Sequence, residues 1–290
     1  MVNKIILGTV QFGLEYGINN INGKPDKETV FEILSSAYDN GIKYLDTAEL
    51  YGDAHNLIGE FHKSVPSKKF NIITKFPHEF EDSVEKKINT YLTQLNVGQL
   101  HAILFHSFDS YLKHKEQLKN IVKLKDKSLK YIGVSVYTNE QMDEVIDDLN
   151  IEIIQIPFNL FDNLNQRGEL LKKAKNKNKI IHTRSAFLQG LFFMKKNNPN
   201  IIRTKLENEL DIIAEISVKS ALSIGSISLN YCLMQNNIDG VLMGVDSLQQ
   251  LKENIAYLEN KISNQYIKEI EKINIQDVNL LNPSLWKSFA

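Results

Sequence analysis

Four side chains of different chemical types occur within the first 106 positions of the 290-residue sequence, each beside an apolar segment. Asp46 and Tyr51 share the stretch "YLDTAELYG", and Lys75 and His106 lie at the ends of the next two apolar segments. A phenol with a pKa of about 10 is a weak acid at neutral pH, but a neighbouring ammonium lowers that pKa. We therefore expect Asp46 to keep Lys75 charged and Lys75 to lower the pKa of Tyr51. His106 would then orient a carbonyl oxygen beside Tyr51 while a cofactor delivers a hydride.

Each of these residues, taken alone, also has an ordinary structural interpretation. Asp46 is compatible with a helix cap or a turn, and Tyr51 with a turn aromatic. Lys75 fits a solvated strand end, and His106 fits a hydrogen-bonded loop histidine. The conjunction of four reactive types at the ends of three consecutive apolar segments favours a site. Six further histidines show no common spacing and receive no chemical assignment: His55, His62, His78, His101, His114 and His182.

Short apolar segments rich in β-branched and aromatic residues recur along the chain. Eight of them occupy residues 4–9, 42–47, 70–76, 101–106, 130–135, 151–158, 179–185 and 240–245. Their length and composition are typical of parallel strands that are covered on both faces. The four reactive side chains thus lie where such strands end or just beyond.

Amphipathic segments lie between the apolar ones. In residues 27–41, apolar side chains recur at three- and four-residue steps, which predicts a helix. The segment 81–98 repeats the pattern and should end near Gly98, whereas Thr138 or Asn139 should cap the start of another helix. Strand and helix therefore alternate along the whole chain.

This alternation predicts an α/β protein in which residues 1–290 form a single (β/α)8 TIM barrel domain. In such barrels the polar residues at the carboxyl ends of the strands meet at one mouth. A doubly wound sheet is the structural alternative. It usually carries a glycine-rich phosphate turn, and both G-x-G-x-x-G and G-x-x-x-x-G-K-[ST] are absent from the sequence.

Composition and charge argue against several other classes of protein. The formal net charge is −1, which gives no indication of a strongly basic face for nucleic acid or anionic lipid. A single cysteine, Cys232, cannot form an internal disulfide, and no Cys/His cluster has the spacing of a zinc site. No apolar run of about 18 residues and no signal-peptide pattern occur. We expect a cytoplasmic monomer or homodimer without metal, nucleic-acid partner or membrane insertion.

The motifs around the four reactive residues resemble those of the aldo-keto reductase family. "GIKYLDTAELYG" is similar to the family's Asp-Thr-Ala-x-x-Tyr-Gly segment, "IITKF" to its lysine strand, and "AILFHSFD" to its histidine strand. "YIGVSVYT" matches its Gly-x-Ser segment, and "IIQIPFNLFD", "TRSAFLQGLF" and "VLMGVDSLQQLKENI" follow in the family's order. The resemblance covers nearly the whole chain.

The resemblance implies an oxidoreductase that reduces an aldehyde or ketone with NADP(H) or NAD(H), Tyr51 being the general acid. The implied cofactor contacts are Gly8, Thr9, Asp46, Ser135, Gln155, Arg184, Ser185, Gln189, Gly190, Gly244, Asp246, Gln250 and Asn254. Within this set, the residues of the fifth and sixth strands would bond the nicotinamide amide. Those after the seventh strand would line the pyrophosphate, those from Gly244 onwards would hold the adenosine, and Gly8 and Thr9 would close the floor.

The sequence departs from the family pattern at three places. Val136 stands where the family often has Asn, and Arg184 stands where it often has an aromatic residue that stacks on the nicotinamide. Gly244 and Gln250 replace basic residues that many members place on the adenosine phosphate, and Asp246 is acidic. An acid repels a 2′-phosphate but accepts a hydrogen bond from a 2′-hydroxyl, so NAD(H) is a serious alternative to NADP(H).

The N-terminal phrase "LGTVQFGLEYGINNINGKP" resembles aldo-keto reductase-like proteins of bacterial surface-polysaccharide and nucleotide-sugar pathways. That likeness suggests a carbonyl on a sugar or sugar derivative. Tyr16, Phe76, Phe108 and Tyr137 are candidates for lining the mouth of the site. Two alternatives remain open: a non-catalytic dinucleotide sensor or partner subunit, and an epimerase or isomerase that recycles its bound cofactor.

Overall fold

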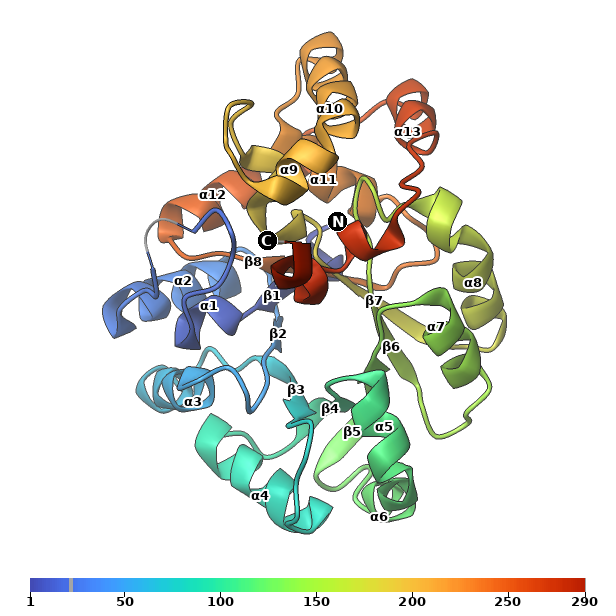
Figure 1. Cartoon of the computed structure of the whole chain (residues 1–290). Coiled ribbons are helices and arrows are strands. Elements are labelled where there is room, and N and C mark those ends of the chain that lie inside the picture. The colour runs from blue at the N-terminus through green and yellow to red at the C-terminus, as the bar shows by residue number, and fades with distance from the viewer. Residues whose placement is uncertain (21–22, 290) are drawn as a thin grey trace.

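The computed structural model describes residues 1–20 and 23–289. Its strands pair in parallel and close into a barrel in chain order, so that β8 pairs with β1. Figure 1 shows the barrel at the centre and the helices around it. The strands are β1 (Ile5–Gly8), β2 (Tyr44–Asp46), β3 (Asn71–Phe76), β4 (Leu100–Phe105), β5 (Leu129–Ser135), β6 (Ile153–Pro157), β7 (Ile180–Arg184) and β8 (Gly240–Gly244). Each overlaps one apolar segment, and the predicted (β/α)8 barrel is confirmed.

Side chains alternate between the two faces of the barrel strands. Leu7, Leu45 and Ile103 belong to the large apolar core that the strands form with the helices. Ile6 and Leu104 belong to a smaller cluster made only of strand residues, which fills the inside of the barrel. Because successive strand residues point to opposite faces, residues two apart share a face.

The inner face becomes polar towards the carboxyl ends of the strands. The strand register places Asp46 beside Gly8 and Gln155 beside Ser135. Lys75 lies two residues after Ile73, a member of the inner cluster, and therefore shares its face. Since all strands run in the same direction, these polar side chains meet at one mouth.

The connections contain α1 (Val10–Gly13), α2 (Lys27–Asp39), α3 (Ala54–Ser64), α4 (Val84–Leu95), α5 (Phe108–His114), α6 (Leu118–Val122), α7 (Asn139–Ile146), α8 (Leu164–Asn176), α9 (Ile201–Lys205), α10 (Glu207–Ser220), α11 (Ile224–Leu233), α12 (Leu248–Ala256) and α13 (Asn264–Ile270). Short 3-10 turns include η3 (Leu188–Phe193), η4 (Tyr257–Glu259) and η6 (Pro283–Phe289). In Figure 1 the helices alternate with the strands around the barrel. Several connections carry more than one helix, which the sequence pattern alone did not resolve.

Local signals set the ends of the helices. Thr138, one of the two predicted caps, forms a capping box with Gln141 at the start of α7. The end of α4 differs from the expectation. It stops at Leu95 because Asn96 adopts a left-handed conformation with φ of 50°, so the stop comes before Gly98.

Membrane-spanning potential was assessed for the helices of the described residues. No single helix there is both long enough and apolar enough to cross a bilayer. α10 and α11 satisfy the length and composition requirement for a membrane span only when they are taken together, and the chain bends by 94° between them.

Candidate active site

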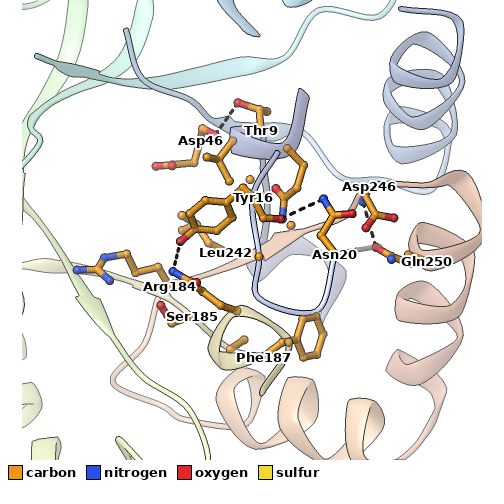
Figure 2. Close-up of a pocket in the computed structure, with 18 of the residues that line it drawn as sticks. Thr9, Tyr16, Asn20, Asp46, Arg184, Ser185, Phe187, Leu242, Asp246 and Gln250 are labelled. Carbon is orange, nitrogen blue, oxygen red and sulfur yellow. Dashed lines mark hydrogen bonds between the residues drawn. The ribbon is translucent and has the colours of Figure 1, made fainter. Parts of the chain in front are cut away.

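A cavity of about 560 Å³ opens at the carboxyl ends of the barrel strands. All four predicted catalytic residues and every predicted cofactor contact line it, together with the connections after β1, β7 and β8. Figure 2 shows Asp46 and Arg184 on one side of this cavity and Asp246 and Gln250 on the other. The volume lies within the range of about 300–1,000 Å³ found for ligand pockets.

The core of the site is a buried ion pair between β2 and β3. Lys75 and Asp46 are only 1% and 2% exposed, and the Lys75 ammonium donates a hydrogen bond to Asp46 Oδ1. Lys75 Nζ also donates to the carbonyl oxygen of Thr47 at 2.9 Å. Burial lowers the pKa of Lys75, and the Asp46 carboxylate opposes that shift through charge and hydrogen bonding. The expected partnership of carboxylate and ammonium is therefore present in the structure.

Tyr51 leans over this ion pair from the turn that follows β2. Its ring centroid lies 5.1 Å from Lys75 Nζ, and its ring meets that of His106 edge-on at 5.6 Å. Burial raises the pKa of Tyr51, and the Asp46 carboxylate raises it further, while Arg184 opposes both. The expected direction of the net shift is wrong, because the pKa of Tyr51 is raised and not lowered. Removal of the phenol from water is the largest cause of this shift.

Two glycines allow the Tyr51 turn to approach α1. A Cβ atom on Gly13 would lie 1.8 Å from the carbonyl oxygen of Tyr51. Gly52 has φ of +53°, and a Cβ there would lie 2.4 Å from the carbonyl oxygen of Gly13. Since real Cβ atoms cannot approach so closely, the position of Tyr51 depends on both residues. Gly13 was not recognised as part of the site from the sequence.

His106 follows β4 and faces the same cavity. Burial lowers its pKa to about 2, and Lys75, His78 and Arg184 lower it in the same direction. The imidazole is therefore neutral at neutral pH and carries one N–H group that can donate a hydrogen bond. His106 Nδ1 is buried without a hydrogen-bond partner within the described part of the chain. The His78 ring stacks on His106 with centroids 5.2 Å apart, a contact that the sequence did not suggest.

The predicted nicotinamide contacts reach the cavity but bond to protein groups in this structure. Gln155 Nε2 donates to the second oxygen of Asp46 at 2.8 Å, which completes the ion pair. Arg184 Nε donates to Ser135 Oγ at 3.4 Å. The Arg184 guanidinium lies 4.0 Å from the ring centroid of Tyr137, where a cation favours the aromatic face. Arg184 stands where the family often has an aromatic residue, and its guanidinium stacks on the ring of Tyr137.

The connections after β1 and β7 meet beside the cavity. Gln189 Nε2 donates to the Tyr16 hydroxyl at 2.9 Å, and Figure 2 shows Tyr16 reaching across the opening. Gly190 has φ of 90°, and a Cβ there would lie 2.9 Å from Asn19 Cβ. Ser185 also adopts a left-handed conformation, with φ of 64°. These backbone conformations let the two connections pack closely around the middle of the cavity.

The floor and the far end of the cavity come from β1, β8 and α12. Thr9 Oγ1 donates to the Asp46 carbonyl oxygen at 3.0 Å, which ties β1 to β2 beneath the site. At the far end, Gln250 Oε1 accepts the backbone N–H of Asp246 at 3.0 Å. Gly244 leaves room for the Gln11 side chain, which a Cβ would approach to 2.7 Å.

Sequence reasoning missed several residues that line the cavity, namely Val10, Gln11, Gly17, Asn19, Asn20, Ala186, Phe187, Phe193, Leu242, Glu253 and Tyr257. Two periodicities point to some of them. Leu242 lies two residues before Gly244 on the inner face of β8, and Glu253 lies one helical turn after Gln250. Of the aromatic candidates for the mouth, Tyr16 and Tyr137 line the cavity. Phe76 and Phe108 instead pack in and against the apolar core outside the barrel.

A barrel mouth that combines a buried lysine–aspartate pair, an un-ionised phenol and a neutral imidazole defines a class of protein. Such a site can protonate a carbonyl oxygen while a dinucleotide reduces the carbonyl carbon, which is the chemistry of an NAD(P)-dependent oxidoreductase. The cavity, lined by amide, hydroxyl and backbone groups, suits a dinucleotide. No group of three or more His, Cys, Asp or Glu side chains within residues 1–20 and 23–289 is arranged to hold a metal ion.

Comparison with known proteins agrees with this class. The model of the aldo/keto reductase family matches residues 4–275, and the chain belongs to this family. The oxidoreductase YqkF of Bacillus subtilis is 24% identical, covering 94% of this chain and 96% of that protein. Aldo-keto reductase AKR11C1 of Bacillus halodurans has the same fold, with a TM-score of 0.77, 18% identity and coverage of 95% and 94%. The glycerol dehydrogenase AKR11B4 of Gluconobacter oxydans also has this fold, with a TM-score of 0.75 and 22% identity. The match covers 93% of this chain and 90% of that protein.

Proposed function

We propose that this oxidoreductase reduces an aldehyde or ketone on a sugar or sugar derivative, with Tyr51 as the general acid. The observation that carries the proposal is the packing of Tyr51 over the buried Lys75–Asp46 pair, with His106 facing the same cavity. Lys75, Asp46 and His106 would each assist proton transfer from the Tyr51 phenol in a different way. Tyr51 is therefore the side chain placed to transfer a proton.

The protonation states support this role. Burial keeps Tyr51 un-ionised, so the phenol holds the proton that the carbonyl oxygen needs. Lys75 stabilises the negative charge that develops on the phenol oxygen as the proton leaves, and Asp46 keeps Lys75 charged. Neutral His106 donates a hydrogen bond that orients the carbonyl oxygen. Solvent returns the proton to Tyr51 after the alcohol has left.

The cofactor NAD(P)H supplies the hydride when it is bound. In this proposal Ser135 and Gln155 would hold its nicotinamide, and Ser185, Gln189 and Gly190 would lie along its pyrophosphate, since all five line the cavity. Polar and aromatic side chains at the mouth support a hydroxyl-rich substrate. Asn19, Tyr16 and Tyr137 line the cavity there and offer hydrogen bonds and flat apolar faces.

The decisive experiment compares the wild-type enzyme with Tyr51→Phe on a panel of aldoses, ketoses and their phosphorylated or nucleotide-linked derivatives. Loss of the general acid should slow single-turnover hydride transfer by about 10²- to 10⁴-fold. Cofactor affinity, measured by titration of protein fluorescence, should change by less than about twofold, because the hydroxyl is not part of the proposed nucleotide contacts. Tyr44→Phe is the matched control, since the Tyr44 ring packs on His101 at 4.8 Å inside the barrel and lines no part of the cavity.

Undiminished hydride transfer in Tyr51→Phe would reject the acid role. Tight cofactor binding without oxidation of the cofactor by any substrate of the panel would instead favour a non-catalytic dinucleotide sensor or partner subunit. Formation of product without net change in cofactor would indicate an epimerase or isomerase. A loss of rate equal to that of Tyr44→Phe would show that the effect is structural.

A further inference from the structure

The charges that line the cavity are separated along its length. Its two basic residues within the described part of the chain, Lys75 and Arg184, both lie near Tyr51. The opposite end, formed by the β8–α12 connection and α12, contributes Asp246 and Glu253 and no lysine or arginine. Figure 2 shows Arg184 and Asp246 on opposite sides of the cavity.

The acidic end is where the adenosine half of a dinucleotide must lie if the proposed function is correct. The nicotinamide has to reach the substrate carbonyl beside Tyr51, so the rest of an extended dinucleotide leads away from the catalytic residues. The same cavity is also lined by Ser185, Gly190 and Gly244 and by residues of the first turns of α12. We call this region, lined by Gly244, Asp246, Gln250, Glu253 and Asn254, the adenosine end.

The acids of the adenosine end are held in place by neighbouring amides. Gln250 Oε1 accepts the backbone N–H of Asp246 at 3.0 Å, which fixes the turn that carries this half-buried carboxylate. Glu253 lies on the exposed side of α12 and accepts a hydrogen bond from Gln249 Nε2 at 2.7 Å. Asn254, beside Glu253, is buried and adds an uncharged amide to the wall.

These carboxylates discriminate between the two nicotinamide dinucleotides by charge. A phosphate monoester carries about 1.5 to 2 negative charges at neutral pH, whereas a 2′-hydroxyl is neutral and can donate a hydrogen bond to a carboxylate. The amino end of α12 contributes an opposing field equivalent to about half a positive charge, part of which is already met by the Ser247 cap. The two formal negative charges of Asp246 and Glu253 are larger than that field.

We propose that this chain selects NAD(H) over NADP(H) through Asp246, with Glu253 as a weaker second determinant. Asp246 has the larger effect because it is half-buried, whereas the exposed Glu253 is screened by solvent ions.

Adenosine fragments test the proposal without hydride transfer. 5′-AMP and 2′,5′-ADP differ only in the 2′-phosphate, and both can be titrated calorimetrically into the wild-type protein. Repulsion between close charges near a protein surface predicts that 5′-AMP binds more tightly than 2′,5′-ADP by about tenfold or more. In Asp246→Asn/Glu253→Gln the preference should shrink to within about threefold, while the affinity for 5′-AMP changes little. Glu144→Gln, on the outer helix α7, removes the same type of charge away from the cavity and should preserve the wild-type ratio.

Equal or tighter binding of 2′,5′-ADP by the wild-type protein would overturn the inference and leave the proposed reductase function intact. An unchanged ratio in the double variant would also overturn it, because the preference would then have another origin. If the protein bound neither fragment and neither intact dinucleotide, the proposed function itself would fail together with the inference.

Discussion

The two ends of the cavity hold their charges in opposite environments. At the catalytic end, Lys75 and Asp46 sit on adjacent strands and are almost completely buried. At the adenosine end, Asp246 and Glu253 lie on a loop and a helix that solvent reaches. Charges are strongly coupled where water is excluded and weakly coupled where it is present. Substitutions should therefore reduce both activity and stability at the catalytic end, and change mainly the nucleotide preference at the adenosine end.

Lys75→Met should produce the largest effect. It leaves the Asp46 carboxylate buried without its cation, so hydride transfer should become too slow to measure and unfolding free energy should fall by about 3–5 kcal/mol. Urea denaturation and single-turnover kinetics would measure both. Lys24→Met is the control, since Lys24 pairs with Asp53 at 2.6 Å with side chains 36% and 48% exposed. Loss of this exposed pair should lower the unfolding free energy by less than about 1 kcal/mol. Equal losses of stability in Lys75→Met and Lys24→Met would contradict the difference between buried and exposed charges.

Gly13→Ala should be the next most damaging change, although the residue carries no reactive group. The new methyl group would collide with the Tyr51 carbonyl oxygen at 1.8 Å and push the phenol out of place. Displacement of a catalytic group by about 1 Å can cost about 10²-fold in rate. Gly98→Ala is the matched control because a Cβ there meets no atom within 4 Å. If both variants keep wild-type rates, Tyr51 is not held by α1.

Acid titration gives a third, smaller effect. His106 keeps a pKa of about 2 in the folded protein, whereas a histidine in the unfolded chain titrates at about 6.5. Below pH 6.5 the unfolded state therefore binds a proton that the folded state does not, and stability falls as the pH falls. From about pH 7.5 to 5.5, His106 should cost the wild-type protein about 1.4 kcal/mol relative to His106→Gln.

Urea unfolding of both proteins at the two pH values would measure this difference. The NMR signals of His106 should also show no titration between about pH 5 and 8, given its strongly lowered pKa. Identical pH dependence of the two proteins would mean that His106 is hydrated and charged like an exposed histidine. The contrast between the two ends of the cavity would then be weaker than the structure indicates.

The smallest effect belongs to Asp246→Asn assayed with NADH. Because the residue lies at the adenosine end, the rate of hydride transfer should change by less than about threefold, with no measurable loss of stability. Its influence on nucleotide choice should weaken as salt increases from about 0.05 to 0.5 M, since solvent ions reach a half-buried charge and screen it in part. A salt-independent preference would place the determinant in a buried group instead.

Much of the fold and the site could be predicted from the sequence because the relevant patterns are local. The apolar segments predicted the strands in their order, and parallel strands place their carboxyl ends on the same side. That rule was sufficient to bring Asp46, Lys75 and His106 to one cavity. Thr138 was predicted as a helix cap for the same reason, since capping depends on residues within one turn.

Other features depend on contacts between distant segments and were predicted incorrectly or not at all. The approach of Gly13 to Tyr51 joins the connections after β1 and β2, and the bond from Gln189 to Tyr16 joins those after β7 and β1. Glu253 reaches the cavity only because α12 packs at its end. Neither spacing nor residue type reveals such contacts in a single sequence.

The sequence by itself determined the class of fold, the order of the strands and the identity of the reactive side chains at their ends. Only the tertiary structure decided the charge states of those side chains. Tyr51 was expected to have a lowered pKa because of Lys75, yet its pKa is raised because burial removes water from the phenol and the Asp46 carboxylate disfavours a second negative charge nearby. Desolvation and charge pairing depend on how completely neighbouring elements enclose a group, and that enclosure exists only after the barrel has closed.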